Sequence, residues 1–255
     1  MSTTASRAFR PSVRLPLLAL ICAATFLGFP PSRAFGAENS ASPLPPESRD
    51  PNWVNLLAGD SLALWENGAA ATRAKTKEIG KLWSVKDGVL SLDKTAKGPG
   101  GQIVTKRSYY DFELRFDFKI SHNGNSGVKY RTDANLLGLE YQILDDAHHR
   151  DAKNPTHRSA SMYELVAAPD TKKHYPPGGE WNTGRIVAKG NRLEHWLNGE
   201  KVVSIEFGSD DWNTRLAKSK YRTIPGFAAS AGSILLQDHG DSVSFRNIYI
   251  RELKP

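Results

Sequence analysis

The segment from Asp111 to Ile120 constrains the fold more than any other part of the chain, because its apolar residues alternate strictly with charged ones. A period of two places successive side chains on opposite faces of a β-strand. The apolar set is Phe112, Leu114, Phe116, Phe118 and Ile120, and the charged set is Glu113, Arg115, Asp117 and Lys119. The segment therefore predicts an antiparallel strand with one face in a core and the other in solvent.

Short runs of similar character fill most of the chain after Leu82, and turn residues separate them. Asp87-Gly88 and Asn198-Gly199 are typical of tight hairpin turns. Only 210–220 suggests a short helix, and no repeat of fixed period indicates a solenoid. The other predicted strands are 83–85, 89–92, 103–105, 127–131, 139–144, 162–166, 181–188, 192–197, 201–207, 234–237 and 243–251. This pattern predicts an all-β sandwich of two antiparallel sheets.

The N-terminus has the features of a secretory signal peptide. Basic residues precede an apolar run from Leu15 to Phe29, and small residues follow near Ala34 to Ala37. The run is short for a membrane span and contains Pro16, although an uncleaved anchor stays an alternative. We therefore expect a signal peptide over 1–37, a Pro- and Ser-rich linker over 38–52 and one domain over 53–255, in a secreted or periplasmic protein without a stable membrane span after cleavage.

Removal of the signal peptide changes what the composition implies. Residues 1–37 contain four arginines and no acid, so the formal net charge falls from +7 to +3. No long run of Lys and Arg remains to follow a phosphate backbone, which argues against a nucleic-acid partner. The only cysteine, Cys22, is also removed, so the mature chain has no disulfide and no thiolate nucleophile or ligand.

The best candidate for a site lies in the predicted strand 139–144. Glu140 and Gln142 share the face opposite Leu139, Tyr141 and Ile143. If this strand pairs with 127–131, Arg131 is expected near both. A carboxylate, an amide and a guanidinium on one sheet face suit sugar recognition or acid–base chemistry, although the pattern alone favours a solvated outer face.

Several segments together resemble the 3-keto-disaccharide hydrolase family. They are Asn125-Ser126-Gly127, Glu140 to Asp145, Gly179 to Asn182, Glu194 to Gly199, Leu236 to Gly240 and Phe245 to Ile248. The resemblance runs from about Trp53 to Leu253 and implies a concanavalin A-like jelly roll with the sugar site on its concave sheet. It also implies action on glycosides whose glucose C3 is a ketone. One departure is Met162, before Tyr163, where the family usually has small residues.

The resemblance adds candidates to the pair Glu140 and Gln142. As catalytic residues it favours Glu140 and His239, and as substrate-binding residues Asn125, Arg131, Gln142, Tyr163, His195 and Asp238. Five of them have a structural alternative: a surface ion pair for Arg131, a core position for Tyr163 and His195, and a turn for Asp238 and His239. Trp181 and Trp196 are expected in the core, and His148, His149 and His157 in a polar loop.

Gln142 bears on the chemistry, because it stands where a conventional glycosidase strand is expected to carry its second carboxylate. A 3-keto sugar needs only a base at C2, an acid for the leaving oxygen and a donor for the enolate oxygen. Glu140 or His239 is the expected base, and Arg131 and Gln142 are the expected donors. A non-catalytic carbohydrate-binding module, a lectin and a conventional glycoside hydrolase remain alternatives. No cofactor is required, although Asp145 and Asp146 are candidate ligands for a cation such as Ca²⁺.

Overall fold

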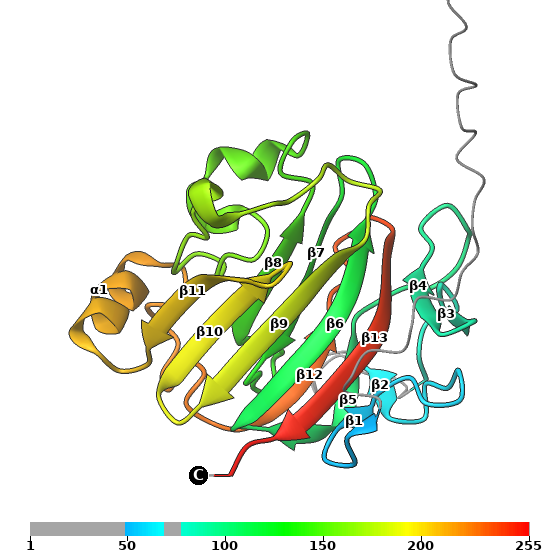
Figure 1. Ribbon diagram of the computed structural model, residues 1–255, viewed down its shortest axis with the longest axis horizontal. Coiled ribbons are helices and arrows are strands. Elements are labelled where there is room, and N and C mark those ends of the chain that lie inside the picture. Colours follow the sequence, from blue (N-terminus) through cyan, green and yellow to red (C-terminus); the bar gives the residue numbers. More distant parts are fainter. Residues whose placement is uncertain (1–48, 69–77, 255) are drawn as a thin grey trace, which may run out of the picture. The chain divides into compact units, whose positions relative to one another are not determined.

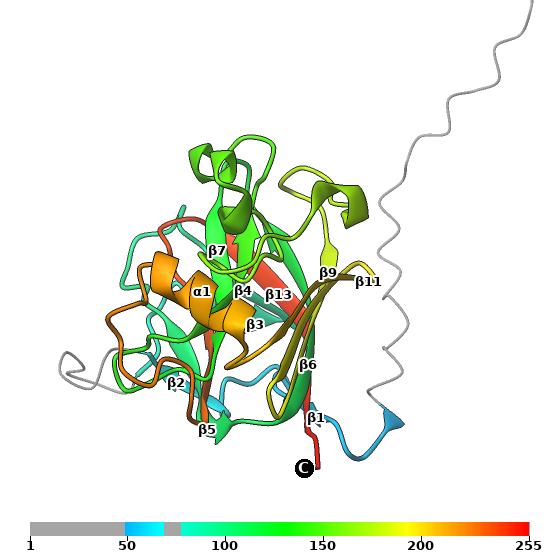
Figure 2. The same ribbon diagram turned by 90° about the vertical axis from the view of Figure 1, so that its left-hand side faces the viewer.

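A computed structural model describes residues 49–68 and 78–254, which form two antiparallel β-sheets packed face to face (Figures 1 and 2). The predicted signal peptide and most of the predicted linker lie outside the described residues. No helix in the described part of the chain is both long and apolar enough to span a membrane. The predicted fold class, an all-β jelly-roll sandwich, is confirmed.

The first sheet has the strand order β11-β10-β9-β6-β13-β4-β3, with β1 paired to β13, and the second has the order β2-β5-β12-β7-β8. The strands are β1 (Val54–Asn55), β2 (Trp65–Asn67), β3 (Trp83–Lys86), β4 (Val89–Leu92), β5 (Ile103–Tyr109), β6 (Phe112–Ile120), β7 (Asn125–Tyr130), β8 (Leu139–Leu144), β9 (Asn182–Lys189), β10 (Arg192–Leu197), β11 (Glu200–Glu206), β12 (Gly232–Leu236) and β13 (Val243–Glu252). The helices are the 3₁₀ segments η2 (Arg150–Lys153), η3 (Pro155–His157) and η4 (Asp170–Lys172), and α1 (Asp210–Lys218).

Strand β6 lies within the first sheet between β9 and β13, and its alternation settles which face is buried. Its apolar side chains are at most 2% exposed. They meet the second sheet through Tyr141, whose ring lies edge-on to Phe116 with 5.3 Å between ring centroids. The predicted core face of this strand is confirmed.

The opposite face of β6 differs from the expected solvated surface at Glu113, which is 2% exposed. Its carboxylate accepts hydrogen bonds at 2.6 Å from both Arg185 and Arg251, and at 3.1 Å from Arg115. Cations from neighbouring strands therefore cover the carboxylate and compensate its charge, as a buried acid requires.

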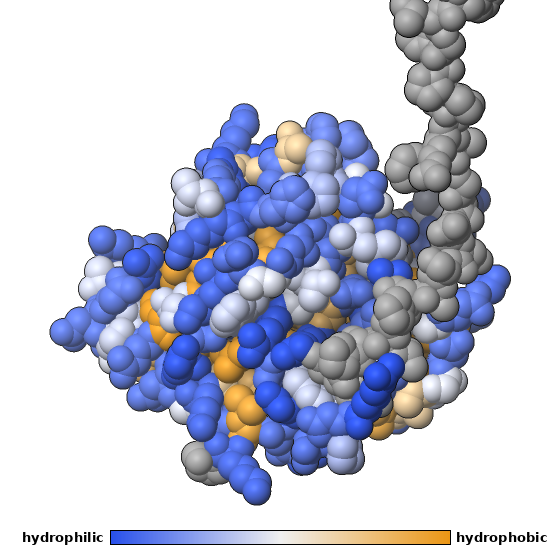
Figure 3. Space-filling view, in the orientation of Figure 1, coloured by the Kyte–Doolittle hydropathy of each residue, from blue (hydrophilic) through white to orange (hydrophobic). Residues whose placement is uncertain are grey.

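Trp181 and Trp196, expected in the core, instead lie half-buried on the outer face of the first sheet. Arg246 stacks over Trp181 at 4.2 Å, and Arg185 over Trp196 at 4.7 Å. Indole faces attract cations, and this attraction allows large rings to remain at a polar surface. The view onto this sheet is predominantly hydrophilic (Figure 3).

The predicted turns and helix are confirmed, with small shifts at their ends. Asp87 and Asn198 adopt positive φ angles of 51° and 49°, which the hairpin turns require and which their glycine partners share. Helix α1 begins after Ser209, whose hydroxyl accepts a hydrogen bond from the Trp212 backbone N–H. The predicted strand 162–166 forms only isolated bridges, one of them between Met162 and Tyr141.

His195 lies in the core between the sheets and is fully buried. Its Nδ1 donates to the Ala160 carbonyl at 3.0 Å, so its Nε2 accepts from the Tyr130 hydroxyl at 2.9 Å. Burial lowers the pKa of His195 to about 4, against the opposing effect of the Ala160 carbonyl.

This depressed pKa predicts a loss of stability in acid. The unfolded chain binds a proton at His195 below its ordinary pKa of about 6.5, whereas the folded protein excludes that proton until pH falls to about 4. As the pH falls through this window, this residue alone should therefore lower the free energy of unfolding by about 1.4 kcal/mol per pH unit. Urea titrations at several pH values should show that the free energy of unfolding of His195→Gln, whatever its absolute value, depends less steeply on pH than that of wild type. An unchanged pH dependence would contradict the assignment.

Candidate functional site

The candidate site lies on the outer face of the second sheet, where β7 and β8 pair with Lys129 opposite Glu140 and Gly127 opposite Gln142. The predicted alternation is confirmed, because Tyr141 points into the core and its two polar neighbours point away from it. The Glu140 Oε2 atom lies 3.6 Å from the Lys129 amine. The cation beside Glu140 is thus Lys129, and not Arg131 as the sequence suggested.

Glu140 and Gln142 are not on a solvated surface, since they are only 5% and 1% exposed. The segment 160–163 runs along the free edge of β8: Gln142 exchanges backbone hydrogen bonds with it, and the Tyr163 N–H donates to the Glu140 carbonyl at 3.0 Å. A buried carboxylate with a charged partner is a more specific environment than a surface ion pair.

The amides beside Glu140 are incompletely satisfied. The Gln142 Nε2 donates to Asn125 Oδ1 at 3.3 Å, while the Gln142 Oε1 is buried and accepts no hydrogen bond from any described residue. Gln237 has a similarly buried and unpartnered Oε1 within the described chain, and its backbone N–H donates to the Gly127 carbonyl. Buried polar atoms are nearly always paired, so these acceptors are suited to hydroxyl groups of a ligand or to ordered water.

Tyr163 extends the site toward a cluster of charged groups. His157 stacks on the Tyr163 ring with 4.3 Å between centroids, and the Lys220 amine lies 4.2 Å from the centroid of the same ring. The two nitrogens of His157 lie 2.9 Å from an Asp151 carboxylate oxygen and 3.3 Å from one of Glu164. A tyrosine, a lysine and a histidine with two carboxylate partners therefore lie next to one another.

The electrostatics of this cluster keep the Tyr163 phenol protonated. Burial is the main effect that raises the pKa of Tyr163, and the carboxylates of Asp151 and Glu140 raise it further. Desolvation lowers the pKa of Lys220, while the negative charges of Glu140 and Glu164 oppose that decrease. The site therefore offers a neutral hydroxyl donor next to an amine with weakened hold on its proton.

Sequence reasoning missed Lys220, Lys129, Asp151 and Glu164. Lys220 follows α1 and contacts Tyr163 from a distant segment of the chain, so no local period marks it. The sequence did indicate Lys129, because the alternation places this residue on the same face as Gly127, on the strand that pairs with β8.

Two predicted binding residues lie elsewhere. Arg131 follows the end of β7 with a φ of 49°, and its side chain is buried on the Tyr110 ring, with hydrogen bonds to the carbonyls of Tyr110 and Gly190. His195 is the core residue described above. His195 thus has the core position given as its structural alternative, whereas Arg131 is buried and is not the surface residue that its alternative described.

The predicted pair Asp238 and His239 follows β12. Asp238 accepts hydrogen bonds from the Gly101 N–H at 2.7 Å and the Lys94 amine at 3.0 Å, and these donors lower its pKa although burial acts to raise it. Asp238 thus holds a turn against the neighbouring loop. His239 is exposed and remains available to solvent or ligand.

The predicted cation ligands Asp145 and Asp146 point to different partners. Asp146 lies 2.7 Å from the Lys173 amine, a cation that occupies the place of a metal. The Asp145 carboxylate accepts from the Asn123 N–H at 2.8 Å and lies 2.8 Å from His148 Nδ1. The two acids therefore do not form one oxygen-lined calcium site.

Gly127 allows the Glu140 carboxylate to lie against the sheet, since a Cβ atom at this position would be 2.6 Å from Glu140 Oε1. Gly127→Ala should therefore displace the carboxylate and lower activity by about 10–100-fold if Glu140 reacts with substrate. Steady-state kinetics of both single variants and the Gly127→Ala/Glu140→Gln double variant test this. The alanine should cost little further activity once Glu140 is replaced; additive losses would show that Gly127 acts by another route.

Comparisons with known proteins agree with this architecture. Residues 52–251 match the 3-keto-alpha-glucoside-1,2-lyase-like domain. The chain is 28% identical over 235 residues to a 3-keto-disaccharide hydrolase of Bacteroides thetaiotaomicron, covering 79% of this chain and 78% of the relative.

Two crystal structures of proteins from Parabacteroides distasonis, both described as glycosyl hydrolases, have the same fold. One is 30% identical with a TM-score of 0.68 and covers 79% of this chain and 94% of its own; the other is 31% identical with a TM-score of 0.59 and covers 79% and 99%. The chain belongs to the family of 3-keto-alpha-glucoside-1,2-lyase-like domains, and its relatives place it among the carbohydrate-active hydrolases.

Proposed function

We propose that the protein cleaves 3-keto glycosides, including 3-keto-disaccharides, by elimination followed by hydration. The C3 ketone makes the C2 proton acidic, and a base on the protein removes it. The resulting enolate re-forms the ketone as a C1–C2 double bond forms and the C1–O bond breaks, and the departing oxygen takes a proton from an acid. Addition of water across C1 and C2 then restores C2–H, and the net change is hydrolysis. We predict that these steps require no cofactor.

Glu140 is the proposed base, and the observation that carries the proposal is its position. Its carboxylate is almost fully withdrawn from solvent on the outer face of the sheet, close to Lys129 and beside an amide whose oxygen has no partner among the described residues. A base in such a place can meet a sugar without competition from bulk water. His239 stays the alternative base.

Lys220 and Tyr163 replace Arg131 as proposed donors. The Lys220 ammonium, which lies against the Tyr163 ring, suits the developing charge on the C3 oxygen, and a protonated phenol suits the leaving oxygen. The contact of His157 with both Asp151 and Glu164 provides groups that can redistribute a proton near this phenol. Gln142 and Asn125 are proposed to bind sugar hydroxyls.

A comparison of substrates tests this function against its rivals. A 3-keto-disaccharide and the same unmodified disaccharide should be offered to the protein, with and without a chelator, and release of reducing sugar followed. We expect turnover of the 3-keto compound alone. Binding of either sugar without turnover would support a binding module or lectin, and turnover of the unmodified sugar alone would support a conventional glycoside hydrolase.

We also propose that the protein is exported, because basic residues at its N-terminus are followed by an apolar run and then by small residues. Mass spectrometry of the protein from its native host should find a mature N-terminus near Ala34 to Ala37. A mature protein that retains Met1 to Phe29 would contradict export with cleavage.

A further inference from the structure

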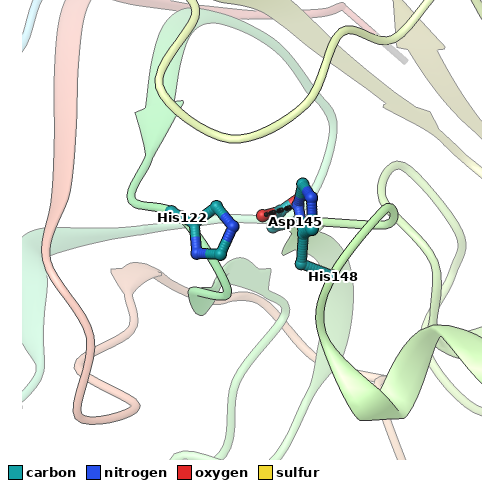
Figure 4. A group of neighbouring side chains, drawn as sticks. All are labelled: His122, Asp145 and His148. Atoms are coloured by element: carbon teal, nitrogen blue, oxygen red, sulfur yellow. Dashed lines mark hydrogen bonds and ion pairs between the residues drawn. The ribbon is translucent and has the colours of Figure 1, made fainter.

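Two histidines and an aspartate converge where β7 begins and β8 ends, apart from the residues assigned to the reaction. His122 belongs to the β6–β7 turn, Asp145 directly follows β8, and His148 lies in the loop beyond it. The candidate ligand atoms of all three lie within 4.8 Å of one another. Figure 4 shows the side chains gathered around one space. From this geometry we infer a binding site for a divalent transition-metal ion, such as Zn²⁺, with His122, Asp145 and His148 as its protein ligands.

The donor set selects the class of metal. Imidazole nitrogens suit Zn²⁺, Co²⁺ and related ions, whereas Ca²⁺ prefers six to eight oxygen ligands. Three protein ligands leave a fourth position for water, an arrangement found in many zinc sites. The site therefore differs in chemistry from a calcium site formed by Asp145 and Asp146.

The distances fit an ion after small side-chain rotations. A tetrahedral ion bound at about 2.1 Å from each ligand holds ligand atoms about 3.4 Å apart. The Asp145 Oδ2 and His148 Nδ1 atoms are already 2.8 Å apart, and the rings of His122 and His148 are tilted at 37° to each other with 4.2 Å between centroids. Both imidazoles are exposed, so they can turn toward an ion without disturbing the core.

The backbone holds both histidine-bearing segments to Asp145. The Asn123 N–H donates to the Asp145 carboxylate, and the Asp145 N–H donates to the Gly124 carbonyl at 3.0 Å. On the other side, the His148 N–H donates to the Asp145 carbonyl at 3.2 Å. Asn123 adopts a φ of 55°, an uncommon conformation that shapes the turn carrying His122. These hydrogen bonds hold the segments that carry the three ligands in place before an ion binds.

The site lies apart from the residues of the proposed reaction. Asp145 is five residues from Glu140, which corresponds to about 16 Å along a strand at about 3.3 Å per residue. An ion here joins the β6–β7 turn to the loop after β8. Because it binds the folded chain in preference to the unfolded one, it raises the melting temperature.

Calorimetric titration of untagged protein with Zn²⁺ tests the inference, with Co²⁺ absorption as a second probe of the coordination sphere. Wild type should bind one equivalent, and its melting temperature should rise by about 5–10 °C at a Zn²⁺ concentration about 100 times Kd. His122→Ala and His148→Ala should each weaken binding by about 100-fold or more. Circular dichroism should show that both variants fold, as expected for exposed side chains.

His174→Ala is the matched control, since it removes another exposed histidine of the described chain and should leave Zn²⁺ binding unchanged. Absence of binding by wild type would overturn the inference. Equal affinity in wild type and both ligand variants would also overturn it, because the ion would then sit elsewhere.

Discussion

Replacement of Glu140 by glutamine is expected to lower kcat/KM on a 3-keto glycoside by roughly 10²–10⁴-fold, the usual share of general acid–base catalysis. Glutamine preserves the size of the side chain and its fit over Gly127, but it cannot accept the C2 proton. The stability should fall only moderately, because the side chain of Lys129, which loses its partner, is 16% exposed. Activity is therefore to be measured per folded molecule, with the folded fraction taken from a thermal melt.

Glu113→Gln provides a matched control, because Glu113 is as deeply buried as Glu140 but lies on the other sheet with Arg115, Arg185 and Arg251. Its loss should reduce stability and leave the activity of the folded protein intact. If both variants lose activity equally, the effect of Glu140→Gln is not catalytic. If neither loses activity, His239 becomes the base to test.

Phe116→Ala is expected to lower the free energy of unfolding by about 3–5 kcal/mol, the cost of a large cavity in a close-packed core. The ring is 2% exposed and lies edge-on to Tyr141 from the opposite sheet. Its other side faces Gly184 on β9, where a Cβ atom would be 2.4 Å from the ring. Gly184 therefore leaves space for this ring and has no side chain that could fill the cavity at that side.

Urea unfolding of Phe116→Ala and Lys119→Ala measures the difference between the two faces of β6. Lys119 is on the outer face, where its amine lies 5.1 Å from the Trp181 ring, so its removal should cost no more than about 1 kcal/mol. Similar losses for the two variants would contradict the assigned orientation of the strand.

The sequence allowed correct prediction of features that depend on neighbouring residues. The alternation of 111–120 predicted which face of β6 is buried, and that of 139–144 predicted that Glu140 and Gln142 share a face. Asp87-Gly88 and Asn198-Gly199 predicted turns because few other pairs adopt positive φ angles at low cost. The ordered motifs supplied the family, which residue chemistry alone did not.

Features that depend on distant segments were not predictable in this way. The expected solvated face of β8 is buried, and a later segment, 160–163, pairs with the edge of this strand. Arg131 leaves the expected face because the chain turns at the end of β7, with a positive φ that its residue type does not signal. Glu113 is buried because arginines from β9 and β13 meet above it.

The central claim, abstraction of the C2 proton by Glu140, is tested most directly by isotope exchange. A 3-keto glycoside should be incubated in deuterated water with wild type and with Glu140→Gln, and deuterium at C2 of recovered substrate and product should be followed by NMR. The account predicts that wild type incorporates deuterium at C2 and that Glu140→Gln does not. Full exchange by the variant, or cleavage by wild type without any deuterium at C2, would contradict it.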